Sequence, residues 1–127
     1  MAQKDIVRES GYSISENNRL TYVYKANMYG AITEVTCVSL EIKIKNMWKT
    51  IIYYDSSHRD ALLHRHTYMT LESESDVTDS VGVKRKGTQK ELLEWSIHNI
   101  TSNYIFYKKR FIKLLRRLDN TIDIELF

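Results

Sequence analysis

The stretch ITEVTCVSLEIKIK, residues 32–45, decides the fold class of this chain. Its apolar and polar residues alternate, and the side chains of a β-strand alternate between its two faces in the same way. The pattern predicts one buried face, formed by Thr36, Val38, Leu40, Ile42 and Ile44. It predicts a second face exposed to solvent, formed by Cys37, Ser39, Glu41, Lys43 and Lys45.

Further strands are indicated on both sides of this stretch. Residues 19–28 alternate in the same way, and residues 8–14 and 48–55 are also strand candidates. Tyr29-Gly30 indicates a turn, because glycine reaches positive φ without strain. Residues 45–47 leave room only for a tight connection. Short connections join antiparallel neighbours, so residues 8–69 are predicted to form an antiparallel β-meander of four to five strands.

A long helix is predicted over residues 88–119. Thr88 and Glu91 have the spacing of a capping box, with Thr88 as the N-cap and Glu91 bonding back to its amide. Apolar residues then recur every three or four positions, as on one face of a helix. These are Leu93, Ile97, Ile100, Tyr104, Tyr107, Phe111, Leu114 and Leu118. The stripe also suits a coiled-coil seam, but its aromatic residues favour packing in a core.

Together these elements predict an α+β fold, in which the meander is covered by one long C-terminal amphipathic helix. The 127 residues are expected to form a single domain, 1–127. Residues 70–87 are predicted to be a mobile acidic loop. The tail, residues 120–127, alternates apolar and polar residues and suits a last strand or a partner contact.

The composition favours a cytoplasmic protein. A single cysteine, Cys37, excludes an intramolecular disulfide and fits a reducing compartment. The N-terminus has no apolar run typical of a signal peptide. No stretch approaches the roughly 18 apolar residues of a membrane span, so no membrane association is predicted.

Charge is unevenly distributed along the chain, although the net charge is only +3. Residues 84–117 contain ten Lys and Arg against two Glu, and ten minus two leaves a local charge of +8. Residues 70–80 contain four acids and no base. This asymmetry indicates an anionic partner.

Residues 48–69 hold three of the four histidines, in what is predicted to be a strand, a turn and a second strand. His64 and His66 are two residues apart, so they share one face of a strand. If the chain turns at about His58, Ile52 lies opposite His64 and Thr50 lies opposite His66. A shift of one residue would place the histidines on the other face.

Three interpretations of the histidines stay open. They can be ordinary residues of an uncovered sheet face. They can bind a metal such as zinc, with His58 or Asp55 as a third ligand. They can act without metal as general acid and base in RNA cleavage, with cations stabilising the phosphorane.

The C-terminal half of the predicted helix is strongly basic. Lys109, Lys113 and Arg116 lie beside or opposite its apolar stripe. Clustered bases are typical of phosphate contact in nucleic-acid-binding proteins. Bases are also common at helix C-termini because of the helix dipole, and this alternative stays open.

The chain resembles small prokaryotic toxins of the TumE type and an adjacent uncharacterised family. The resemblance rests on Trp48–Asp55 followed by His58, on His64-Arg65-His66, and on a closing helix with Tyr107 and Arg110-Phe111. The chain departs from the family at Tyr53-Tyr54, where an arginine is common, in lacking a Pro-His turn, and in its acidic loop. The resemblance implies a toxin that acts on RNA and is neutralised by a DNA-binding antitoxin.

The leading hypothesis is a small cytoplasmic toxin-like protein that binds RNA, with cleavage of that RNA left open. The alternatives are a non-catalytic protein- or nucleic-acid-binding module and, third, a metal-dependent hydrolase. RNA, an antitoxin-like protein and a second copy of the chain are the candidate partners, and no cofactor is predicted. The catalytic candidates are His58, His64 and His66. The phosphate-binding candidates are Arg59, Arg65, Lys109, Lys113 and Arg116.

Overall fold

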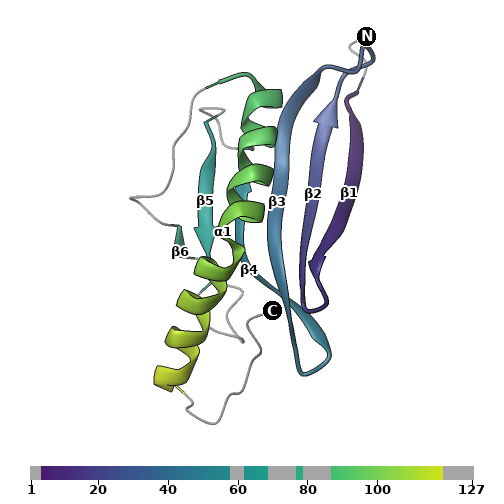
Figure 1. Ribbon diagram of the computed structural model, residues 1–127. Coiled ribbons are helices and arrows are strands. Elements are labelled where there is room, and N and C mark those ends of the chain that lie inside the picture. The colour runs from purple at the N-terminus through teal and green to yellow at the C-terminus, as the bar shows by residue number, and fades with distance from the viewer. Residues whose placement is uncertain (1–3, 58–61, 69–76, 79–86, 119–127) are drawn as a thin grey trace.

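An antiparallel sheet with one helix packed on one face forms the architecture of the protein in the computed structural model (Figure 1). The structure describes residues 4–57, 62–68, 77–78 and 87–118. The strands are β1 (Ile6–Ser15), β2 (Asn18–Ala26), β3 (Ile32–Ile44), β4 (Met47–Asp55), β5 (His64–Thr67) and β6 (Val77–Thr78), and the helix is α1 (Gln89–Leu118). The predicted α+β fold class is confirmed. The short β6 falls in the segment predicted to be a loop, and the predicted tail lies outside the described residues.

The strands follow one another in the sheet in chain order, and every neighbouring pair is antiparallel. The β3–β4 turn is formed by Lys45 and Asn46, both with positive φ, which matches the twist of a two-residue hairpin. Gly30 has a φ of 82°, as the predicted turn requires. The Asn27 side chain accepts bonds from the amides of Tyr29 and Ala31 and closes this turn.

The helix-facing side of the sheet holds the hydrophobic core. Four of the five residues predicted to be buried in β3 are buried; the exception is Thr36, which is half-buried. The register between β2 and β3 skips Thr36, since Val23 pairs with Cys37 and Tyr24 pairs with Val35. This bulge brings Val35 into the core in place of Thr36.

The opposite face of β3 is less exposed than its pattern predicts. Ser39 is only 5% exposed and Cys37 is half-buried. The reason lies in the neighbouring strands, whose side chains Asp55 and His66 are buried on this same face. Polar side chains of β4 and β5 therefore help to bury Ser39 from one side, although no apolar pattern marks this face.

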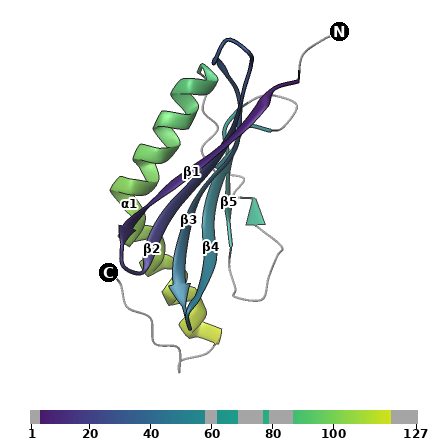
Figure 2. The same cartoon turned by 90° about the vertical axis from the view of Figure 1, so that its right-hand side faces the viewer.

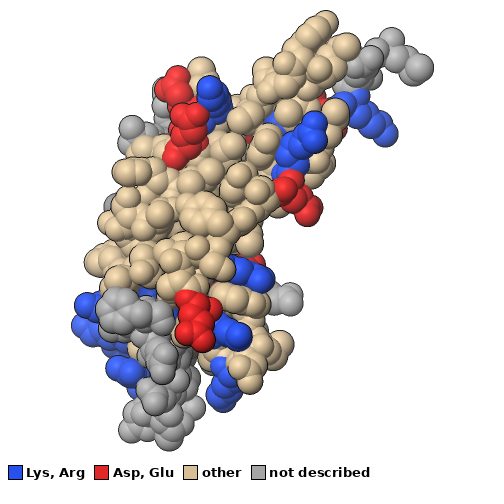
Figure 3. Space-filling view, turned by 45° about the vertical axis from the view of Figure 1, so that its right-hand side comes forward, with Lys and Arg blue, Asp and Glu red and all other residues tan. Residues whose placement is uncertain are grey.

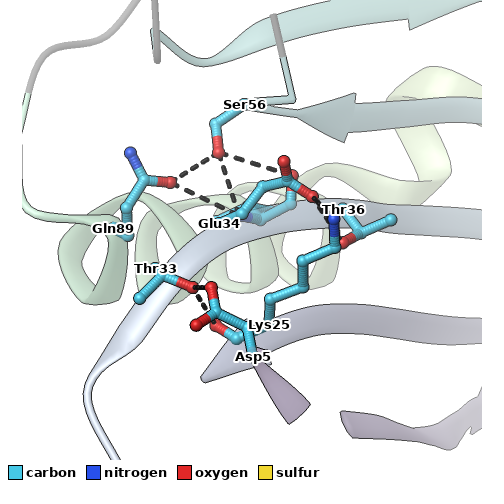
Figure 4. Close-up of polar contacts among 8 residues, drawn as sticks. Asp5, Lys25, Thr33, Glu34, Thr36, Ser56 and Gln89 are labelled. Atoms are coloured by element: carbon cyan, nitrogen blue, oxygen red, sulfur yellow. Dashed lines mark hydrogen bonds and ion pairs between the residues drawn. The ribbon is translucent and has the colours of Figure 1, made fainter. Parts of the chain in front are cut away.

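Helix α1 begins where the capping signal predicts. The Thr88 hydroxyl accepts a bond from the Glu91 amide at 3.2 Å and donates one to the Glu91 carboxylate at 3.1 Å. The Glu91 carboxylate thus accepts a bond from the Thr88 hydroxyl. In the predicted capping box it would accept one from the Thr88 amide instead. Gln89 ties the helix start to the sheet, because its side-chain oxygen accepts bonds from the Ser56 hydroxyl and the Val35 amide (Figure 4).

The buried stripe of α1 is rotated slightly from the predicted one. Ile97, Tyr104 and Leu114 are half-buried, and the following residues, not predicted as part of the stripe, are buried: Leu92, Ser96, Lys108, Ile112 and Leu115. The helix packs mainly on β3, while β1, separated from β3 by β2, is largely exposed at the edge of the sheet (Figures 1 and 2). Among the described residues no helix has the length and apolar character needed to cross a membrane.

Candidate functional site

Strand β5 places the two neighbouring histidines on the sheet face away from α1. His64 pairs with Asp55 and His66 pairs with Tyr53. The prediction that the histidines share a face is confirmed, but the predicted register, with His64 opposite Ile52, is wrong by three residues. An odd shift moves both histidines to the other face of the sheet.

The cause of the shift is the length of the strand before the turn. Ser56 is buried, and its amide donates a bond to the Val35 carbonyl at 2.8 Å. The chain therefore still bonds to β3 after Asp55, and it turns later than a turn centred on His58 requires. Leu63, at the start of the returning strand, is fully buried and fixes the returning register.

His66 and Asp55 form a buried pair on this face. The Nε2 atom of His66 lies 2.9 Å from Oδ2 of Asp55, and the two residues are 5% and 6% exposed. The imidazole also stacks on the Tyr53 ring, with centroids 4.4 Å apart and planes at 10°. A carboxylate in this position orients an imidazole, as it does for a general base. His66 offers a substrate almost no accessible surface.

Cys37 lies on the same face, one strand away. Its Sγ atom is 2.9 Å from the Ser39 hydroxyl. Burial raises the pKa of the Cys37 thiol, and the negative charges of Asp55 and Glu41 raise it further, while the Ser39 hydrogen bond opposes them. The thiol is therefore held in its protonated, weakly nucleophilic form.

The remaining predicted site residues that the structure describes do not gather around the histidines. His58 and Arg59 lie outside the described residues. Arg65 is half-buried on the opposite face of the sheet, beside the Tyr54 phenol. The predicted phosphate contacts of the helix, Lys109, Lys113 and Arg116, are exposed on the C-terminal half of α1.

A second polar cluster, between the sheet and α1, escaped the sequence reasoning. The hydroxyls of Tyr54 and Tyr107 both donate to Oδ1 of Asn99, at 2.7 and 2.5 Å. Burial raises the pKa of Tyr54 well above its usual value, and Tyr107 raises it further, whereas the charge of Arg65 opposes the shift. One feature of the sequence points to this cluster: Asn99 lies two helical turns before Tyr107, and the hydroxyl of a buried tyrosine needs a hydrogen-bond partner.

The "basic end" of the molecule is formed by two elements that are far apart in sequence. The β3–β4 turn and the C-terminal end of α1 lie at the same end of the molecule (Figures 1 and 2). Residues 41–50 hold three bases and residues 104–118 hold six, of which Lys108 is buried, and Arg19 of β2 lies beside them. Among the described residues, the acids at this end are Glu41 and Glu16, the latter in the neighbouring β1–β2 turn. Figure 3 shows Lys and Arg gathering at this end with an acidic side chain among them, while most of the middle of that view is uncharged. The accessible bases here are Arg19, Lys43, Lys45, Lys49, Lys109, Arg110, Lys113, Arg116 and Arg117.

An aromatic side chain lies among these bases. Trp48 pairs with Lys43 across the hairpin, on the face away from α1. The Arg19 guanidinium carbon lies 4.1 Å from the Trp48 ring centroid, and Lys43 Nζ lies 5.9 Å from it. Arg19 also forms an ion pair with Glu41.

The metal hypothesis finds no ligand set in the described part of the chain, where no three His, Cys, Asp or Glu side chains group to hold an ion. His58, which that hypothesis uses, is outside this part.

No protein-family model matches the sequence, and neither a curated protein nor a solved structure matches it significantly. The resemblance to TumE-type toxins stays a prediction.

Proposed function

We propose that this protein binds RNA and that its basic end contacts the phosphate backbone. The observation that carries the proposal is the convergence of two separate elements, the β3–β4 hairpin and α1, on one end where nine accessible bases outnumber the acids Glu16 and Glu41. Phosphate contact by lysine and arginine supplies most of the affinity of such proteins for nucleic acid. RNA is the ligand that the resemblance to TumE-type toxins implies.

The helix dipole accounts for only part of this charge. It favours bases in the last turn of a helix, where Arg116 and Arg117 lie. Lys109 lies more than a turn earlier, and Lys43 and Lys45 belong to a different element. A dipole at the end of α1 gives no reason for bases on the hairpin, whereas a shared anionic ligand does.

The buried Asp55–His66 pair supports a second candidate function, cleavage of the bound RNA. The 2.9 Å contact between Asp55 and His66 is the favouring observation, because it orients an imidazole as a general base is oriented. His64, half-buried on the same face, is the candidate partner for proton transfer. The burial of His66 weighs against this role, so we place RNA binding first.

The toxin-like character extends the same proposal. A cytoplasmic toxin that acts on RNA is neutralised by an antitoxin, and an antitoxin that blocks RNA binding would cover the basic end. Covering this end requires acidic or phosphate-like groups on the partner, because the surface offers little else to pair with. A second copy of this chain carries the same positive charge and is disfavoured at this end.

RNA binding is tested by fluorescence anisotropy with a labelled RNA over a range of salt concentrations. The triple variant Lys109→Ala/Lys113→Ala/Arg116→Ala should weaken binding about tenfold or more and flatten the salt dependence. The matched control is Lys4→Ala/Arg8→Ala/Lys90→Ala, which removes three exposed bases at the opposite end. Equal losses in the two variants would reject the basic end as the binding surface.

Cleavage is tested by gel analysis of the same RNA after incubation, with and without a chelator. His64→Ala should abolish cleavage while leaving RNA affinity unchanged, because His64 lies on β5 and outside the basic end. Intact RNA with the unmodified protein would remove the second candidate and leave RNA binding in place.

A further inference from the structure

We infer that the basic end selects single-stranded RNA and that an unpaired base stacks on Trp48. This inference rests on the proposed RNA binding and names the form of RNA that the same surface accepts. It is carried by an aromatic ring embedded among cations on the sheet face away from α1, at the end where phosphate contact is proposed.

The position of Trp48 is suited to stacking. The ring is half-buried, and it lies on the face of β4 opposite the core residues that contact α1. Its indole is held by Arg19 and Lys43, whose charges lie within 6 Å of the ring centroid. A ring fixed in this way loses little conformational freedom when a base packs on it, and the two cations can contact the phosphates on either side.

A second aromatic–cation pair lies nearby, formed by Lys49 of β4 and Tyr68, but Lys49 pairs with the buried Ile42 and therefore lies on the other face of the strand from Trp48. Lys49 Nζ lies 4.8 Å from the Tyr68 ring centroid, and Tyr68 lies 6.0 Å from Tyr53. Trp48 and its two cations therefore form the proposed stacking site, because a ring flanked by cations binds single strands without sequence preference, since every base presents a π face. In a duplex the π faces of the nucleobases are stacked inside the double helix. Only the phosphates then remain to contact the Lys and Arg side chains of the protein.

The chain offers an internal control for this inference. Trp95, the other tryptophan, packs edge-on against Tyr54 with centroids 5.5 Å apart, on the helix side of the sheet. Trp48 and Trp95 thus lie on opposite faces. A Trp95→Phe variant leaves Trp48 as the single tryptophan and makes its fluorescence specific for the proposed contact.

The experiment titrates Trp95→Phe protein with single-stranded RNA and with a duplex of the same length and sequence. Single-stranded RNA should bind at least tenfold more tightly and quench Trp48 fluorescence, and the duplex should leave the fluorescence unchanged. Trp48→Leu, made in the unmodified chain, should weaken single-strand binding about tenfold while keeping duplex affinity, and Trp48→Tyr should restore most of the loss. Met47→Ala, at an exposed neighbouring position, is the matched control and should change neither affinity.

The outcomes separate this inference from the proposal on which it rests. If neither RNA binds, the proposed function itself is rejected, and a protein partner becomes the better explanation of the surface. If both RNAs bind equally and Trp48 is not quenched, RNA binding stands and base stacking is rejected. A Trp48→Leu protein with unchanged thermal unfolding and unchanged single-strand affinity would also overturn the inference.

Discussion

The least expected residues in this structure are the acidic and imidazole side chains buried on a sheet face without a covering helix. Asp55 and His66 contact each other at 2.9 Å, and the Tyr53 ring covers the imidazole. Each partner lowers the cost of burying the other, so neither can be removed without leaving a polar group in a poor environment. The pair is therefore expected to contribute to stability whether or not it has a catalytic role.

This interdependence can be measured with a double-mutant cycle. Asp55→Asn and His66→Gln should each lower the free energy of unfolding by about 2–3 kcal/mol, because each leaves the other group without its charge-assisted contact. The double variant should lose clearly less than the sum of the two. Denaturant unfolding of the four proteins gives the coupling energy. If the two losses in free energy of unfolding simply add, the contact contributes no coupling energy.

Tyr54 should make stability depend on alkaline pH. Its pKa is raised above the ordinary value of 10.0 because the phenol is buried and bonded in its neutral form. The unfolded chain then loses this proton first, so the stabilisation is complete below about pH 10 and declines as the pH rises above it. Asn99 and Tyr107 hold the hydroxyl in this state.

The comparison with Tyr54→Phe isolates this contribution. The variant should lose about 1 kcal/mol at neutral pH, the usual value of one hydrogen bond. Above about pH 10 the advantage of the unmodified protein should shrink, because only the unmodified protein has a phenol at position 54 to ionise on unfolding. Urea unfolding at a series of pH values measures both curves, and curves that stay parallel would contradict the raised pKa.

Residue patterns predicted which side chains share a face but not which face they occupy. The two-residue spacing of His64 and His66 was enough to place them together, because the period of a strand is local. Their register depends on where β4 stops pairing with β3, which is decided by the Ser56 contact with Val35. A contact over 21 residues leaves no local pattern, and the same is true of the Tyr54–Asn99 bond.

At the scale of elements, periodicity and capping signals located the long strands and the helix. The predicted helix, 88–119, agrees closely with Gln89–Leu118, since the N-cap and the apolar spacing are local signals. The bulge at Thr36 and the two-residue β6 were not predicted. A bulge changes the face of a residue without changing the composition of its strand, so the alternation alone cannot reveal it.

Strand β1 depends on close backbone contact with β2 at Gly11. A Cβ atom at this position would lie 2.6 Å from the Leu20 carbonyl oxygen and 3.2 Å from the Thr21 Cα. Gly11→Ala should therefore displace β1 and lower the free energy of unfolding by about 1–3 kcal/mol. Chemical denaturation measures the loss, with Ser10→Ala, at the exposed neighbouring position, as the control. Equal stability of the two variants would show that β1 shifts without cost.

At the scale of the whole molecule, the α+β fold follows from one clean alternation and one amphipathic helix. The apolar face of the sheet needs cover, and α1 provides it over β3 and β4. The site could not be derived in the same way. The basic end exists only because the β3–β4 hairpin and the end of α1 lie close together in the folded protein. The two elements are far apart in the sequence, so no local pattern predicts that they lie together.

The order of the elements has a consequence for the synthesis of the protein. The six strands that the structure describes all precede α1, and each pairs with the strand beside it in the chain, so this sheet can form while translation continues. Until α1 leaves the ribosome, the face that carries Leu40, Ile52 and Tyr54 has no cover from the helix. The nascent chain therefore passes through a stage in which a folded apolar surface is open to chaperones and to neighbouring nascent chains.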